Sequence, residues 1–181
     1  MFTMFDLAEV KSEIFESRGS GLYTPQKSEL CFDLSLMSSL DRGTACEKLI
    51  CKIMNRHGID ATHTGGSGNR NDISLYVGGK IVRGEVKSSL LGPQSGKYYF
   101  VGVKPELFDV LFLTFVTPEG IVVKTASAAS IRRWVSEYNP KNKAKQSSDT
   151  PQYDIYFTGD MTNSKIPTIE WNPSAEGVVK I

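Results

Sequence analysis

The stretch that decides the fold is NDISLYVGGKIVRGEVK, residues 71–87. Gly78-Gly79 stands between two runs in which apolar and polar residues alternate. A diglycine in that position is typical of a two-residue β-hairpin loop, because the favoured hairpin turns need positive φ. The loop therefore predicts a hairpin in which Val77 faces Lys80.

This register gathers charged side chains on one face of the hairpin. Counting outwards from the loop, Asp72 faces Glu85, and Lys87 lies two residues beyond Glu85 on the same face. Like charges directly opposite each other are destabilising, so we expect something to offset the repulsion of the two carboxylates. The other face carries the apolar side chains that build the core, namely Ile73, Leu75, Val77, Val82 and Val86.

Two carboxylates and a lysine in one place point to metal chemistry. Mg²⁺ takes one or two protein carboxylates and keeps its other positions for water and substrate phosphate, and Mn²⁺ could replace it. A neighbouring ammonium could lower the pKa of a metal-bound water or stabilise charge that builds on a phosphate. The simpler interpretation of Asp72, Glu85 and Lys87 is a solvated strand face with a Glu/Lys salt bridge.

Length and composition indicate one globular domain. The chain has 181 residues, 40% of them hydrophobic, and a formal net charge of +1, which excludes global disorder and gives no argument from overall basicity. The three cysteines, Cys31, Cys46 and Cys51, form no CxxC pair, so we expect a reducing compartment. With neither a secretory signal nor a long apolar run, we expect a cytoplasmic protein that contacts no membrane.

The periodicity along the chain predicts an α/β fold, a mixed central β-sheet flanked by helices. Helices are expected at 2–16, 44–57 and 126–138, and strands at 29–37, around Thr62, and at 72–77, 80–88, 98–103, 109–116, 121–124 and 153–157. We divide the chain into an N-terminal helix and strand (1–43) that caps the core or makes a dimer contact, a core (44–138), and a basic loop with a C-terminal edge strand (139–181). All three parts are expected to form one domain.

Asp72, then twelve intervening residues, then Glu85-Val86-Lys87 resembles the D…ExK signature of the PD-(D/E)xK nuclease superfamily, whose fold is called restriction-endonuclease-like. The resemblance covers residues from about 44 to 125 and departs from the family at Asn71, where proline is usual. It implies a Mg²⁺-dependent DNA endonuclease of the restriction or homing/phage type, acting in a bacterial cell or a phage-infected host. Asp72, Glu85 and the Val86 carbonyl would bind the metal, and Lys87 would assist the attacking water.

The same resemblance implies a role for Glu47 on the preceding helix, where a glutamate often completes the metal site. Thr44-Ala45-Cys46-Glu47 also matches a capping box, in which Glu47 would fold back onto the Thr44 amide. Both interpretations of Glu47 remain open at this point.

Several further residues are candidates for contacts with nucleic acid. The glycine-rich loop 64–70, which ends at Arg70, could approach a phosphate or be a simple turn. His63 could contact a phosphate, but a packing or surface position is the simpler expectation. Ser88 and Gln94 follow the lysine closely, and Gln94 with Tyr98 resembles the QxxxY element of exonucleases in this superfamily. One dense basic patch carries a local charge of +4, either as a solvated loop or as a grip on DNA, through Arg132, Arg133, Lys141, Lys143 and Lys145.

Double-stranded DNA is the partner that these features imply, and cutting both strands favours a homodimer. The alternatives are a catalytically silent nucleic-acid-binding module of the same fold, or a junction-resolving or exonucleolytic member of the superfamily.

Overall fold

The structure is a computed structural model that describes residues 34–65, 71–117, 120–142 and 150–171. The helix predicted at 2–16 lies outside these ranges. The helices and strands follow one another as α3 (Ser39–Arg56), β1 (Asp60–His63), β2 (Ile73–Val77), β3 (Lys80–Leu90), β4 (Lys97–Val103), β5 (Val110–Val116), β6 (Ile121–Ser127), α4 (Ala128–Tyr138), β7 (Tyr153–Thr158) and β8 (Ile169–Glu170).

The central sheet has six strands in the order β1-β2-β3-β5-β6-β8. The β3–β5 pairing is parallel and the other pairings are antiparallel, so the sheet is mixed, as predicted. Strands β4 and β7 pair with each other in a separate two-stranded sheet. The predicted C-terminal strand is therefore present, but β4 is its partner.

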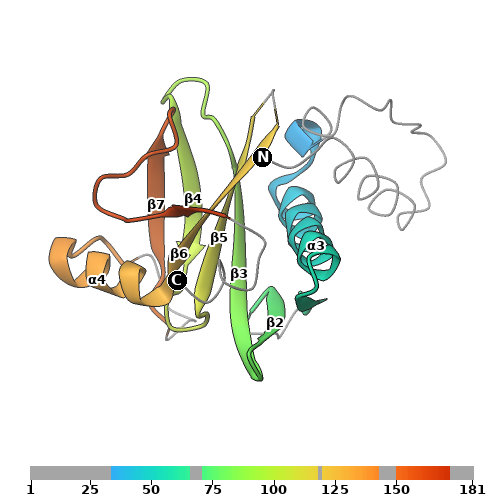
Figure 1. The fold of residues 1–181 in the computed structure, drawn as a ribbon. Helices are drawn as coiled ribbons and strands as arrows, with labels where there is room; N and C mark the ends of the chain where they lie inside the picture. The colour runs from blue at the N-terminus through green and yellow to red at the C-terminus, as the bar shows by residue number, and fades with distance from the viewer. Residues whose placement is uncertain (1–33, 66–70, 118–119, 143–149, 172–181) are drawn as a thin grey trace.

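Two apolar cores cover the two faces of the central sheet. On one face, Ile50 and Met54 of α3 pack with Phe112 of β5. On the other face, Leu113 of β5 packs with α4 and with the inner side of the β4–β7 sheet. Figure 1 shows the result, with α3 on one side of the sheet and α4 with β4 and β7 on the other.

The predicted hairpin register is confirmed from Val77 to Ile73. Val77 pairs with Lys80 and Ser74 with Arg83, and the last pair is Ile73 with Gly84, so the predicted pair of Asp72 with Glu85 is not part of the ladder. Gly78 and Gly79 have φ of +57° and +78°, the positive values that such a turn needs. The loop chemistry and the alternation are both local properties, which is why the sequence predicts this register.

Two predictions at the start of the described chain are wrong. Residues 34–36 are helical, although the alternation over 29–37 predicted a strand. Helix α3 begins at Ser39 and not at Thr44, because the Ser38 hydroxyl accepts the Asp41 N–H at 3.2 Å and so caps the helix.

No helix in the described part of the chain is both long enough and apolar enough to cross a membrane.

Candidate active site

The Asp72 carboxylate lies against β3, just beyond the end of the β2–β3 pairing. Its Oδ2 accepts the Val86 N–H at 2.8 Å, and the Asp72 N–H donates to the Gly84 carbonyl at 3.1 Å. A side-chain oxygen therefore takes the place that a backbone carbonyl would hold if the ladder continued. This contact fixes Asp72 beside the Glu85-Val86-Lys87 segment of β3.

The Val86 carbonyl is directed toward the same side of β3. In an extended strand the N–H and C=O of one residue leave the backbone on the same side. Since the Val86 N–H donates to Asp72, the Val86 carbonyl also points away from β5. The sequence-based suggestion that this oxygen could bind metal is compatible with that direction.

Glu85 and Lys87 form a short ion pair on β3. Lys87 Nζ lies 2.6 Å from Glu85 Oε1, and the two side chains are 26% and 11% exposed. Their positions two residues apart place them on one strand face, as the alternation predicts. The salt bridge expected from the simpler interpretation is thus present, in a setting where both groups are largely removed from water.

Glu47 is not a helix cap. Thr44 lies inside α3, where its hydroxyl donates to the Leu40 carbonyl at 3.2 Å, so the capping-box interpretation is wrong. Glu47 Oε2 instead lies 2.7 Å from His63 Nε2 on β1. The sequence suggested a phosphate contact or a packing or surface position for His63, and not this pair, because a lone histidine carries no local signal for a partner sixteen residues away.

The three acids and the lysine share one electrostatic environment. Burial raises the pKa of Glu85, Lys87 opposes that shift, and the negative charges of Asp72 and Glu47 add to it. Burial also raises the pKa of Glu47, against the hydrogen bond from His63. Burial alone would lower the pKa of Lys87, but Glu85, Asp72 and Glu47 together raise it, so the lysine stays protonated.

The donor set fits a hard divalent cation in its chemistry. Three carboxylates and one ammonium give the cluster a formal charge of −2, and carboxylate oxygens are ligands that Mg²⁺ prefers. Within residues 34–65, 71–117, 120–142 and 150–171, however, no group of three or more His, Cys, Asp or Glu side chains is arranged to hold a metal ion. Only one or two protein carboxylates are needed for Mg²⁺, so Asp72 and Glu85 meet the requirement in type and number.

The predicted nucleic-acid contacts do not gather at this cluster. Ser88 comes directly after Lys87 on β3, so its side chain faces the other side of the sheet. Its register partner on β5 is Thr114. Gln94 is exposed in the turn before β4, whereas Tyr98 is 3% exposed and packs edge-on against Phe115. The predicted QxxxY tyrosine therefore belongs to the core.

The described part of the basic patch lies on the α4 side of the sheet. Arg132 donates from its guanidinium to the Pro105 carbonyl at 2.8 Å, so part of its hydrogen-bonding capacity supports the fold. Arg133 and Lys141 are exposed. The other predicted contacts, Arg70, Lys143 and Lys145, lie outside the described residues.

No protein-family model and no curated protein matches the chain. Among solved structures, the bacterial homing endonuclease I-Ssp6803I is similar at 13% sequence identity and a TM-score of 0.49, over 67% of this chain and 79% of that one. A structural neighbour of this chain is thus a homing endonuclease, and the likeness is one of backbone arrangement that assigns no residue here a role.

Proposed function

We propose that this protein is a Mg²⁺-dependent endonuclease that hydrolyses phosphodiester bonds in double-stranded DNA. The observation that carries the proposal is the contact between Asp72 Oδ2 and the Val86 N–H, at 2.8 Å. It places an aspartate beside a half-buried Glu-x-Lys strand segment, with a second glutamate, Glu47, within electrostatic reach. This is the arrangement that the D…ExK resemblance implies.

Asp72 and Glu85 would hold the cation, with the Val86 carbonyl as a further oxygen. Glu47 would support it directly or through water, while His63 holds the Glu47 carboxylate in place. Mn²⁺ would suit the same oxygens. A bound cation supplies Lewis-acid activation of a phosphate and a water molecule of lowered pKa.

Lys87 has the charge that phosphate chemistry needs. Three nearby acids keep its amino group protonated although the side chain is largely buried. In a site of low dielectric, an ammonium stabilises charge that develops on a phosphate more strongly than it would in water. Lys87 would therefore orient the attacking water and stabilise the pentacovalent phosphate.

Arg133 and Lys141 would bind the DNA backbone through their exposed charges, and Arg132 would contribute through the part of its guanidinium not bound to Pro105. Such contacts position a duplex without reading its sequence, and they weaken as salt rises. A homodimer would supply the second active site for the second strand. Sedimentation with and without DNA tests this assembly.

The cleavage test uses supercoiled plasmid, the full chain and Mg²⁺. We expect nicked or linear products with the natural protein, none with EDTA, and a loss of about 10²- to 10⁴-fold with Lys87→Ala. Lys80→Ala is the matched control, since Lys80 is an exposed lysine at the other end of β3. It should cleave like the natural protein.

One observation favours a second function, a catalytically silent module that binds nucleic acid. The 2.6 Å pair between Lys87 and Glu85 already occupies both groups with each other. DNA binding without any cleavage in Mg²⁺ or Mn²⁺ would support that function and contradict ours. Cleavage that persists in both EDTA and Lys87→Ala would indicate a contaminating nuclease.

A further inference from the structure

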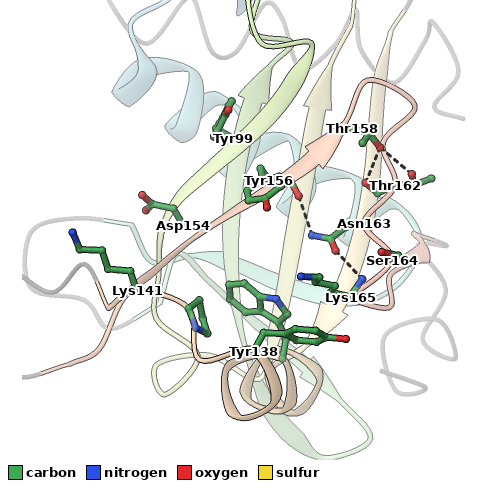
Figure 2. Close-up of a pocket in the computed structure, with 12 residues that line it drawn as sticks. Tyr99, Tyr138, Lys141, Asp154, Tyr156, Thr158, Thr162, Asn163, Ser164 and Lys165 are labelled. Carbon is green, nitrogen blue, oxygen red and sulfur yellow. Dashed lines mark hydrogen bonds between the residues drawn. The ribbon is translucent and has the colours of Figure 1, made fainter.

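A groove of about 670 Å³ lies on the outer side of the β4–β7 sheet, away from the core. Its aromatic and basic lining comes from β4, β7, α4 and the segments that follow α4 and β7, namely Tyr99, Trp134, Tyr138, Lys141, Tyr156 and Lys165. Figure 2 shows Tyr156 between Tyr99 on one side and Tyr138 with Lys165 on the other. Neither the proposed cleavage nor the predicted basic patch accounts for these aromatic side chains.

Tyr99 and Tyr156 form an exposed aromatic pair. They are register partners in the β4–β7 ladder, and their ring centroids are 6.2 Å apart with the planes tilted by 43°. Tyr99 is 47% exposed and Tyr156 is 52% exposed, while the adjacent Tyr98 and Phe157 point inward and fill the core. Because the inner face of this sheet already supplies the packing, the outer tyrosines are available to a ligand.

Lysine ammonium groups stand close to these rings. Lys97 Nζ lies 5.0 Å from the centroid of Tyr156, and Lys165 Nζ lies 4.5 Å from the centroid of Tyr138. Of the described residues that line the groove, Asp154 is the single acid, and its Oδ1 accepts the Gly102 N–H at 3.2 Å. The balance of charge in the groove is therefore positive.

Aromatic faces interleaved with ammonium groups match the chemistry of single-stranded nucleic acid. Bases stack on the rings, and the phosphates that link them pair with the lysines. A duplex hides its base faces, so exposed tyrosines offer it little beyond what lysines alone provide. We propose that this groove binds single-stranded nucleic acid, with bases stacked on Tyr99 and Tyr156 and phosphates near Lys141 and Lys165.

The β4–β7 sheet is attached to the strand that carries the candidate active site. The Tyr99 N–H donates to Ser89 Oγ at 2.9 Å, and Ser89 follows Lys87 by two residues on β3. A single strand of nucleic acid in the groove would therefore be bound to the β4–β7 sheet. This sheet contacts β3 two residues beyond Lys87. The binding itself does not rest on the proposed cleavage.

The test measures fluorescence anisotropy of labelled oligothymidine and oligouridine of about 15 nucleotides, within the span of known single-strand sites, on the full chain in EDTA. We expect both oligomers to bind, with Tyr99→Ala and Tyr156→Ala each weakening binding by about 5- to 100-fold. Tyr156→Phe should keep the affinity, because stacking needs the ring and not the hydroxyl. Tyr76→Ala is the matched control, since Tyr76 is 56% exposed on β2 and lies outside the groove.

Three results would overturn the inference. They are no binding of either oligomer by the natural protein, equal losses in Tyr76→Ala and Tyr156→Ala, and oligomer binding that neither Tyr99→Ala nor Tyr156→Ala weakens. The last result would assign oligomer binding to the lysines alone. Because this assay is run in EDTA and reads binding alone, a failure of the nuclease proposal is distinguishable from a failure of this one.

Discussion

His63 Nε2 lies 2.7 Å from Glu47 Oε2, and this contact joins strand β1 to helix α3 at the edge of the candidate site. Gly65 makes room for it, because a Cβ at Gly65 would come within 2.5 Å of His63 Nε2 and 2.7 Å of Glu47 Oε2. The pair therefore depends on a helix, a strand and a loop glycine that meet only in the folded chain.

Removing the histidine should destabilise the protein. His63→Ala leaves the half-buried Glu47 carboxylate without this partner, and we expect the free energy of unfolding to fall by about 1–3 kcal/mol. Urea denaturation at neutral pH measures the change. His57→Ala is the control, because His57 is exposed at the end of α3; a loss of similar size there would contradict the prediction.

Gly84 should tolerate no side chain. A Cβ at Gly84 would overlap Ile73 Cγ1 and come within 3.2 Å of Phe112, so Gly84→Ala overpacks the core where β3 meets β2 and β5. We expect a loss of about 1–3 kcal/mol in the free energy of unfolding. Gly120→Ala, where a Cβ meets nothing within 4 Å, should stay within about 0.5 kcal/mol of the natural protein.

Asp109 should contribute a pH-dependent stability. Hydrogen bonds from the Arg83 guanidinium, at 2.8 and 3.1 Å, hold the pKa of Asp109 below its usual range. A lowered folded-state pKa means that the contribution is complete above the unfolded pKa of about 4 and is lost as pH falls through the folded value. We expect Asp109→Asn to lower the free energy of unfolding by up to about 1 kcal/mol at neutral pH, and by less toward pH ~2. The effect is small because the Arg83 and Asp109 side chains are both nearly half exposed.

Chemical denaturation across that pH range measures the Asp109 effect. Glu106→Gln removes an exposed acid from the connector before β5 and controls for the change in net charge. A difference between Asp109→Asn and the natural protein that stays constant with pH would contradict the assignment.

Cys51 should resist alkylation in the folded protein. Burial, with a smaller effect of Glu47, raises the pKa of Cys51 to about 12. The thiolate fraction at pH ~8.5 is then about three orders of magnitude below that of an unfolded cysteine, and labelling should slow accordingly. Mass spectrometry of iodoacetamide-treated peptides, with and without urea, gives the rates; equal rates in the two conditions would refute the expectation.

Predictability differed between the parts of the candidate site. Asp72, Glu85 and Lys87 lie on adjacent segments, so a diglycine loop and a two-residue period suffice to predict that they share one side of the hairpin. The contact of Glu47 with His63 could not be predicted, because the sequence from Thr44 to Glu47 matches the pattern of a helix N-terminus. In the structure, Ser38 is the N-cap of that helix. The aromatic groove was missed because Tyr99 and Tyr156 are far apart in sequence and meet only through strand pairing.

The chain by itself determines the hairpin, its register, the buried strand β5 and the helix–strand order from α3 to β7, since each follows from turn chemistry or periodicity within a short window. Only the tertiary structure decides that β4 pairs with β7 in a separate sheet, and that His63 contacts Glu47. The physical reason is that alternation shows which face of a strand is apolar but not which distant segment covers that face. That choice depends on how the apolar surfaces of the whole domain pack together.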